Sequence, residues 1–154
     1  MSKNINFETT SKFKTPDESP GYLLWCVSTQ WRTAIEKVLK PLDLTHPQFV
    51  VLASTGWLTR GESRASQVDI GRKAGLDPNT TSQILRGLEA KKLIERVRTS
   101  DERSKNPILT VLGSRRLKEA LPAVENADAQ FFALLSAEES QRLVKIFQSL
   151  VIKK

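Results

Sequence analysis

Short polar side chains are concentrated in residues 79–86, where their types and spacing suit hydrogen bonding to the edges of nucleic-acid bases. Asparagine and glutamine can pair with adenine, arginine can pair with guanine, and serine and threonine accept several bases. The candidate base-reading residues are Asn79, Thr80, Ser82, Gln83 and Arg86. A helix that is only solvated usually carries more glutamate and lysine on its outward side, so this composition favours a DNA-reading surface.

Residues suited to catalysis or metal binding are few. The chain has one histidine and one cysteine, which leaves no nucleophile-and-base pair and no cluster of zinc ligands. It also lacks the glycine-rich motifs that cradle phosphates and the GxSxG motif of a nucleophile elbow. We therefore expect no enzyme, no cofactor and no metal site.

The element that must hold the polar set is a helix that begins near Asp77. Asp77 can cap this helix while Pro78 takes the first helical position, where its missing N–H costs nothing. A shorter helix over 67–74 precedes it, capped by Ser66 and ended by Gly75. Two helices joined by a short turn have the layout of a helix-turn-helix. Its second helix has a predicted buried side made of Ile84, Leu85 and Leu88.

After this helix the hydrophobic period changes from 3.6 to 2. Residues 93–99 predict a strand, residues 100–106 a polar loop, and residues 107–110 a returning strand. Such a hairpin is the wing of a winged helix-turn-helix, which can place cations against phosphates or in a minor groove. The wing candidates are Arg103 and Lys105, and the further phosphate candidates are Ser66, Gln67 and Arg98.

The hairpin also carries a motif, Asp-x-Arg, five residues, then Leu-Thr-x-x-Gly. It stands at Asp101, Arg103, Leu109, Thr110 and Gly113. With this motif the chain resembles the MarR family of bacterial transcription regulators, and residues 44–49 resemble the entry to that family's second helix. The resemblance implies a winged helix-turn-helix lobe held in a homodimer by terminal helices.

Two positions depart from the family pattern. Lys92 stands where the family usually has glycine, so we expect a left-handed backbone there at a cost of about 1 kcal/mol. Gly87 stands where a larger residue is usual, and glycine inside a helix is weakly unfavourable.

Positive charge is localised. The formal net charge is +7, and residues 60–118 hold 14 Lys or Arg against 7 Asp or Glu, which accounts for the whole excess. Counterion release at a phosphate backbone exploits such a patch. A solvated basic face explains the charge alone equally well, but the helix and the hairpin favour double-stranded DNA.

The predicted fold is mostly α with a small β-hairpin wing. Residues 1–19 are polar and predict a flexible arm, and residues 20–154 predict a single protomer. Within it, 45–112 is the expected DNA-binding lobe, entered at the capping box Thr45 to Gln48, while 20–42 and 113–152 are the expected dimerisation helices. Pro122 is expected to kink or split the helix after the wing. An intramolecular bundle of the terminal helices is the alternative to a homodimer.

Four residues are candidates for an effector pocket: Trp31, His46, Trp57 and Arg60. In the resembled family such a pocket takes small aromatic or amphipathic compounds. Each residue also has a plainer interpretation, since both tryptophans suit a core and His46 suits a surface or capping position at a helix start.

Cys26 invites comparison with a branch of the family that senses organic hydroperoxides through a cysteine on the first helix. A sensing thiol needs exposure and a lowered pKa, whereas Cys26 has the apolar neighbours Trp25 and Val27 and no adjacent cation in the sequence. We expect it to be a packing residue.

The sequence thus predicts a cytoplasmic, homodimeric repressor that binds a pseudo-palindromic operator and is released by a small effector, with no apolar run long enough for a membrane. A redox switch through Cys26 and a basic module that docks an acidic protein are the two alternatives.

Overall fold

The computed structural model describes residues 4–61, 63–98 and 105–151. The chain divides into two units, one up to Thr33 and one from Ala34 onward, and the division falls inside helix α2 (Pro20–Leu39).

The first unit contains more local structure than its polarity predicts. Helix α1 (Phe7–Thr10) is capped by Asn6, whose Oδ1 accepts the N–H of Thr9 at 3.2 Å, and a 3₁₀ turn, η1, covers Pro16–Glu18. Neither element buries a residue. The flexibility expected of residues 1–19 stays a prediction.

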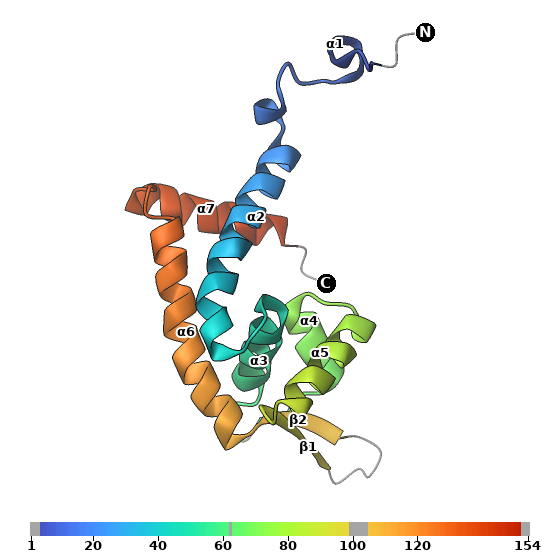
Figure 1. The fold of residues 1–154 in the computed structure, drawn as a ribbon, viewed down its shortest axis with the longest axis vertical. Coiled ribbons are helices and arrows are strands. Elements are labelled where there is room, and N and C mark those ends of the chain that lie inside the picture. The colour runs from blue at the N-terminus through green and yellow to red at the C-terminus, as the bar shows by residue number, and fades with distance from the viewer. Residues whose placement is uncertain (1–3, 62, 99–104, 152–154) are drawn as a thin grey trace. The chain divides into compact units, whose positions relative to one another are not determined.

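The second unit runs from the end of α2 through one 3₁₀ turn, five helices and a two-stranded hairpin (Figure 1). Its elements are η2 (Lys40–Leu42), α3 (His46–Leu58), α4 (Gln67–Ala74), α5 (Pro78–Ala90), β1 (Ile94–Arg98), β2 (Lys105–Leu109), α6 (Val111–Phe131) and α7 (Ala137–Leu150). The predicted fold class is therefore confirmed. No described helix is both long and apolar enough to cross a membrane.

Side-chain caps mark the starts of three helices. Thr45 and Gln48 form the predicted capping box of α3, Ser66 and Asp69 form one at α4, and Ser136 and Glu139 form one at α7. Gly75 ends α4 in the left-handed conformation with φ of 69°. These caps fix where each helix begins, and hence which side chains each one turns inward.

Helix α3 is the centre of this unit and contacts α4, α5, α6 and β2. Its Val51 and Leu52 are fully buried, as are Ile70 of α4 and Leu85 and Leu88 of α5. Helices α4 and α5 cross closely, because a Cβ on Gly71 would lie 2.6 Å from the Thr81 hydroxyl oxygen. These two helices and the hairpin of β1 and β2 are together called the reading head.

The hairpin is antiparallel, with Ile94 opposite Leu109 and Arg98 opposite Lys105. Strand β2 starts two residues earlier than predicted and ends before Thr110, which caps α6 instead. Helix α6 passes through Pro122 without splitting, contrary to that part of our expectation. Proline removes one backbone hydrogen bond, and the turns on both sides keep theirs.

Candidate nucleic-acid interface

Helix α5 presents three of the five predicted base-reading side chains on one exposed face. Asn79, Gln83 and Arg86 are exposed, while Thr81, Leu85 and Leu88 are buried. At about 100° per residue, the three exposed side chains fall within about 60° of one another and opposite the buried set. They project as a row of amide, amide and guanidinium.

The other two predicted readers lie at the edges of this face. Thr80 and Ser82 are half-buried, and the Thr80 hydroxyl donates to Oδ2 of Asp77 at 2.5 Å. The same carboxylate accepts the Thr80 N–H at 3.0 Å, and these hydrogen bonds lower the pKa of Asp77. Thr80 is therefore committed to the cap of α5, and Ser82 flanks the row.

Ser66 is engaged in the same way at the start of α4. Its hydroxyl oxygen accepts the Asp69 N–H at 3.2 Å and donates to Oδ2 of Asp69 at 2.6 Å. The side-chain hydrogen bond with Ser66 is the main cause that lowers the pKa of Asp69. The Ser66 hydroxyl acts here as a cap, so its role as a phosphate contact stays a prediction.

Arg96 connects the three elements of the reading head, which sequence reasoning missed. Its Nε lies 3.3 Å from Oε2 of Glu89 at the end of α5, and its Nη1 donates at 3.3 Å to Oε1 of Gln67 at the start of α4. Gln67, a predicted phosphate residue, is thereby joined to the wing. Strand alternation was the available signal, because Arg96 shares a face with the buried Ile94.

The predicted wing cations are described only in part. Arg103 lies outside the described residues. Arg98 and Lys105 pair across the hairpin in backbone register, and their side chains lie outside the description.

The root of the wing explains the Leu-Thr-x-x-Gly motif. The Thr110 hydroxyl donates to the carbonyl of Lys92 at 2.7 Å and accepts the Gly113 N–H at 2.9 Å, and the Thr110 N–H donates to the carbonyl of Leu93 at 3.1 Å. A Cβ on Gly113 would lie 1.8 Å from the Leu93 carbonyl oxygen. Threonine and glycine are both required for α6 to start against the end of α5.

Lys92 takes the left-handed conformation that the sequence predicts, with φ of 58°. Its N–H donates to the carbonyl of Glu89 at 2.9 Å, and the next N–H, of Leu93, reaches back to Leu88 at 2.9 Å. These bonds close the C-terminus of α5, as glycine commonly does at this position.

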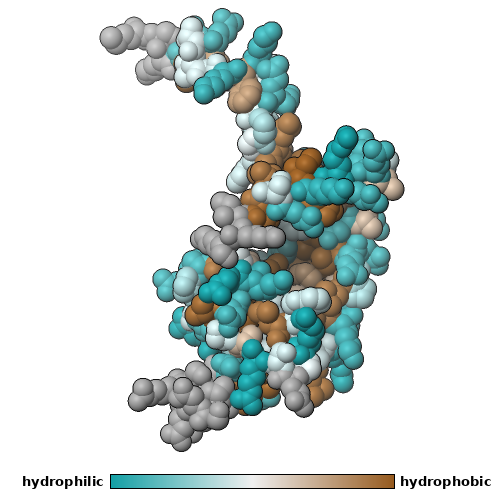
Figure 2. All heavy atoms as spheres, turned by 180° about the vertical axis from the view of Figure 1, so that it is seen from behind, coloured by the Kyte–Doolittle hydropathy of each residue, from teal (hydrophilic) through white to brown (hydrophobic). Residues whose placement is uncertain are grey.

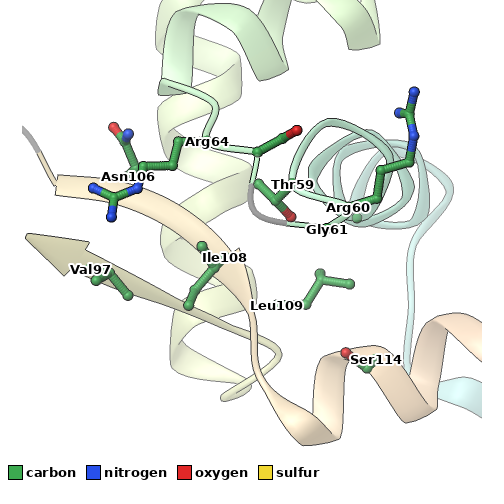
Figure 3. A pocket seen from close by; sticks show the side chains of 11 residues that line it. Thr59, Arg60, Gly61, Arg64, Val97, Asn106, Ile108, Leu109 and Ser114 are labelled. Atoms are coloured by element: carbon green, nitrogen blue, oxygen red, sulfur yellow. The ribbon is translucent and has the colours of Figure 1, made fainter. Parts of the chain in front are cut away.

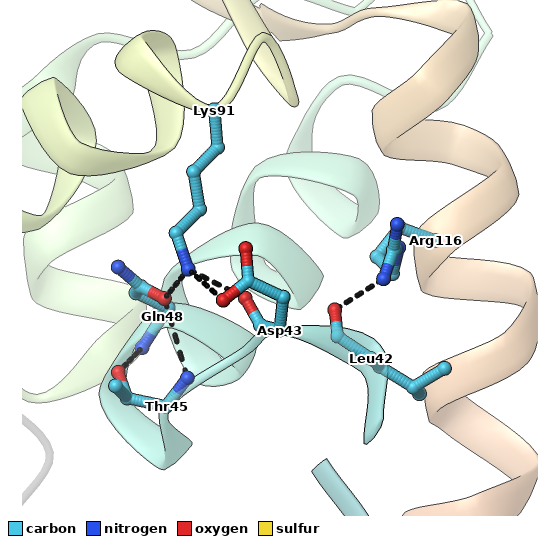
Figure 4. A network of polar contacts seen from close by, with 6 residues as sticks. All are labelled: Leu42, Asp43, Thr45, Gln48, Lys91 and Arg116. Atoms are coloured by element: carbon cyan, nitrogen blue, oxygen red, sulfur yellow. Dashed lines mark hydrogen bonds and ion pairs between the residues drawn. The ribbon is translucent and has the colours of Figure 1, made fainter. Parts of the chain in front are cut away.

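A polar network joins the far end of α5 to the turn after α2 (Figure 4). The Lys91 ammonium lies 3.0 Å from Oδ1 of Asp43 and 3.2 Å from Oε1 of Gln48, and it also donates to the Asp43 carbonyl. Arg116 of α6 donates to the carbonyl of Leu42 in the same turn. The end of α5 is thus held by Asp43, just after η2, and by Gln48 of α3, while α6 holds the same turn through Arg116.

The four candidate effector residues are not gathered at one place. His46 begins α3 and Trp57 is near its end, so eleven residues, or roughly 16 Å of helix, separate them. Trp57 and Arg60 do meet, with the guanidinium carbon 3.9 Å from the ring centroid and Lys73 Nζ at 5.9 Å. Trp31 belongs to the other unit.

The plainer interpretations of Trp57 and His46 are wrong. Trp57 is 56% exposed at the end of α3, with two cations over its ring, and His46 is buried, while Thr45 and not His46 is the cap of the helix. Within the described part of the chain no group of His, Cys, Asp and Glu could hold a metal ion.

Cys26 is a free, half-buried thiol on α2. A hydrogen bond with Cys26 is the largest cause that raises the pKa of Tyr22, one helical turn earlier. Around it, α2 exposes a band of large apolar residues: Tyr22, Leu23, Leu24, Trp25 and Val27.

Comparison with known proteins identifies relatives over most of the chain. The MarR family model matches residues 44–105. The HTH-type transcriptional regulator YdcH of Bacillus subtilis is 35% identical over 134 residues, covering 86% of this chain and 91% of that protein. The HTH-type transcriptional repressor Rv2887 of Mycobacterium tuberculosis is 31% identical over 136 residues, covering 87% and 95%.

Solved structures show the same fold. CouR of Rhodococcus jostii, bound to p-coumaroyl-CoA, superposes with a TM-score of 0.81 at 24% identity, covering 92% of this chain and 98% of that chain. Rv2887 in complex with DNA gives 0.68 at 28% identity, covering 87% and 98%. Rv2887 in complex with salicylic acid gives 0.67 at 30% identity, covering 86% and 96%.

Proposed function

The chain belongs to the MarR family of winged helix-turn-helix transcription regulators, and from this premise we propose that it is a repressor that binds a pseudo-palindromic operator as a homodimer in the cytoplasm. The exposed row of Asn79, Gln83 and Arg86 on α5 is the observation that carries this proposal. In it, residues 45–112 form the DNA-binding lobe, and residues 20–42 and 113–152 are the dimerisation helices.

The row supplies the chemistry of base recognition. Amide side chains can pair twice with adenine, and a guanidinium can pair twice with guanine, in a major groove wide enough for a helix. Gln67, Arg98, Arg103 and Lys105 supply phosphate contacts around it. The relative Rv2887 has been solved in complex with DNA, which supports this use of the head.

A homodimer is supported by apolar surface on both terminal regions. In addition to the exposed band of α2, helix α7 exposes Val144, Ile146, Phe147 and Leu150. Figure 2 shows such hydrophobic residues, in brown, at the molecular surface. A second copy that covers them would place two copies of α5 about 34 to 36 Å apart, which is one turn of DNA.

Release by a small effector is supported by the relatives. Rv2887 binds salicylic acid, and 6-hydroxynicotinic acid regulates DNA binding by BpsR of Bordetella bronchiseptica. An effector that prefers a dimer with the wrong head spacing lowers operator affinity by linkage. We extend to this chain only the class, a small aromatic or amphipathic compound.

The test is selection of bound fragments from the source genome, followed by titration of the selected duplex and a scrambled duplex at several salt concentrations. We expect specific binding that weakens steeply with salt, and a slope that falls by about one unit in Arg103→Ala. A chain that prefers no duplex over scrambled DNA at any salt concentration is not this repressor.

Two alternatives have their own readouts. A redox switch through Cys26 requires that thiol oxidation abolish operator binding in the wild type and not in Cys26→Ser. A basic module that docks an acidic protein requires that the head bind that protein while showing no preferred duplex.

A further inference from the structure

A hollow of about 500 Å³ lies at the root of the wing, between the loop after α3, the hairpin and the start of α6 (Figure 3). We call it the wing-root hollow. Its polar walls include Arg64, Asn106 and Ser114, and its apolar wall includes Val97, Ile108 and Leu109. This volume and this mixture of walls are typical of sites for small organic molecules.

The apolar wall is held in place by close packing. A Cβ on Gly56 of α3 would lie 2.9 Å from the Cδ1 atom of Leu109 and 2.9 Å from the Cδ2 atom of Leu117. Strand β2 and α6 therefore press against α3 just beside the hollow. The wall belongs to the packed body of the second unit.

Arg64 supplies the positive charge of the hollow. Its side chain extends beside Asn106, as Figure 3 shows. Among the described residues, no carboxylate pairs with its guanidinium and no acceptor takes its hydrogen bonds. The neighbouring Arg60 also lines the hollow, but its guanidinium lies over the Trp57 ring and donates to the Trp57 carbonyl.

These walls select one ligand class. A guanidinium fork pairs twice with a carboxylate, and the Asn106 amide and the Ser114 hydroxyl can add hydrogen bonds. The apolar wall disfavours a small inorganic anion, since it gives that anion nothing to replace its water. We propose that the wing-root hollow binds an amphipathic monocarboxylate, with the carboxylate at Arg64 and the apolar body against Ile108.

The consequence for regulation rests on the proposed function, whereas the binding itself does not. A ligand in the hollow contacts the loop after α3 and both strands of the hairpin. It therefore fixes the wing relative to the body that carries α5, and operator affinity changes on binding.

The test uses 2-naphthoate as the probe, with the neutral 2-naphthamide as its match. Titration of naphthoate into the isotope-labelled full chain should shift the amide signals of Val97, Asn106, Ile108 and Ser114. Naphthamide should bind with an affinity at least about tenfold lower. Arg64→Gln should weaken naphthoate binding tenfold or more. Arg115→Gln removes the same charge from an exposed residue of α6 that does not line the hollow, and it should change naphthoate affinity less than about threefold.

A second variant tests whether the ligand occupies the hollow itself. Ser114→Leu adds carbon atoms at the rim of the hollow and should weaken naphthoate and naphthamide alike. The inference is overturned if naphthoate does not bind, if its shifts map elsewhere, or if Arg64→Gln and Arg115→Gln weaken its binding equally. If naphthoate binds at these residues and no operator is found, the site stands and the repressor does not.

Discussion

Gly113 cannot be replaced by a larger residue without moving the backbone, because a backbone atom occupies the position that a Cβ would take. A neighbouring side chain could turn aside, whereas a backbone carbonyl cannot. The Leu93 carbonyl occupies the place of the Gly113 Cβ, at 1.8 Å, and that carbonyl also accepts the Thr110 N–H. The motif residues Thr110 and Gly113 therefore serve the junction between α5, the wing and α6.

Gly113→Ala should lower the free energy of unfolding by more than about 3 kcal/mol, because backbone must move to admit one methyl group. The matched variant is Gly87→Ala, where the Cβ would meet only the Gln48 amide at 3.4 Å. It should raise stability by about 0.5 to 1 kcal/mol through helix propensity. Urea denaturation of both variants checks the pair, and equal effects would contradict this account of the junction.

Lys92→Gly should stabilise the chain by up to about 1 kcal/mol, because glycine adopts a φ of 58° without a Cβ penalty. The same substitution at Lys91, whose backbone has φ of −78°, should destabilise it and break the network to Asp43. Thermal denaturation distinguishes the two. A loss of stability in Lys92→Gly would show that its side chain outweighs the backbone strain.

Acid should remove stability through the capping carboxylates. Hydrogen bonds to Ser66 and Thr80 lower the pKa values of Asp69 and Asp77, so the folded state binds these protons less readily than the unfolded state. Their stabilisation is complete above a pH of about 4 and is lost as pH falls through the lowered values. In Asp77→Asn, which keeps a capping side chain, unfolding free energy should fall less steeply below pH 4. If the unfolding free energy of Asp77→Asn fell as steeply below about pH 4 as that of the wild type, the capping carboxylate of Asp77 would not be a cause of the acid sensitivity.

At the scale of elements, the caps in the sequence predicted the starts of α3, α4 and α5, whereas the start of α1, which Asn6 caps, was not predicted. Thr45, Ser66 and Asp77 all cap the helices they were expected to cap. Long-range partners were not predictable in this way. The contacts of Arg96 and Lys91 join residues up to 48 positions apart, and only the fold brings them together.

Arg96 should act as a clamp between the wing and the two helices of the reading head. In Arg96→Met the ion pair with Glu89 and the hydrogen bond to Gln67 are lost, and stability should fall by about 1 kcal/mol or less because the pair is partly exposed. Amide exchange should accelerate in β1 and β2 while α6 keeps its protection. Uniform acceleration across α6 and the hairpin would mean that Arg96 serves global stability only.

At the scale of the whole molecule, the exposed row on α5 was easier to predict from the sequence than the residues of an effector pocket. The row on α5 followed from helical periodicity, since residues 79, 83 and 86 share a face whatever the rest of the chain does. No periodic pattern linked the candidate effector residues, and the structure separates His46 from Trp57 along α3. The wing-root hollow depends on how a loop meets a hairpin, which periodicity does not encode.

The central claim is that the row on α5 reads bases, and it is tested most directly by affinity for the selected operator and for a scrambled duplex. Gln83→Ala and Arg86→Ala should each cost about 1 to 3 kcal/mol on the operator and little on the scrambled duplex. Lys118→Ala, which removes an exposed cation from α6, should leave the ratio of the two affinities unchanged. If Gln83→Ala and Arg86→Ala weaken both duplexes equally, the row does not read sequence and the account is contradicted.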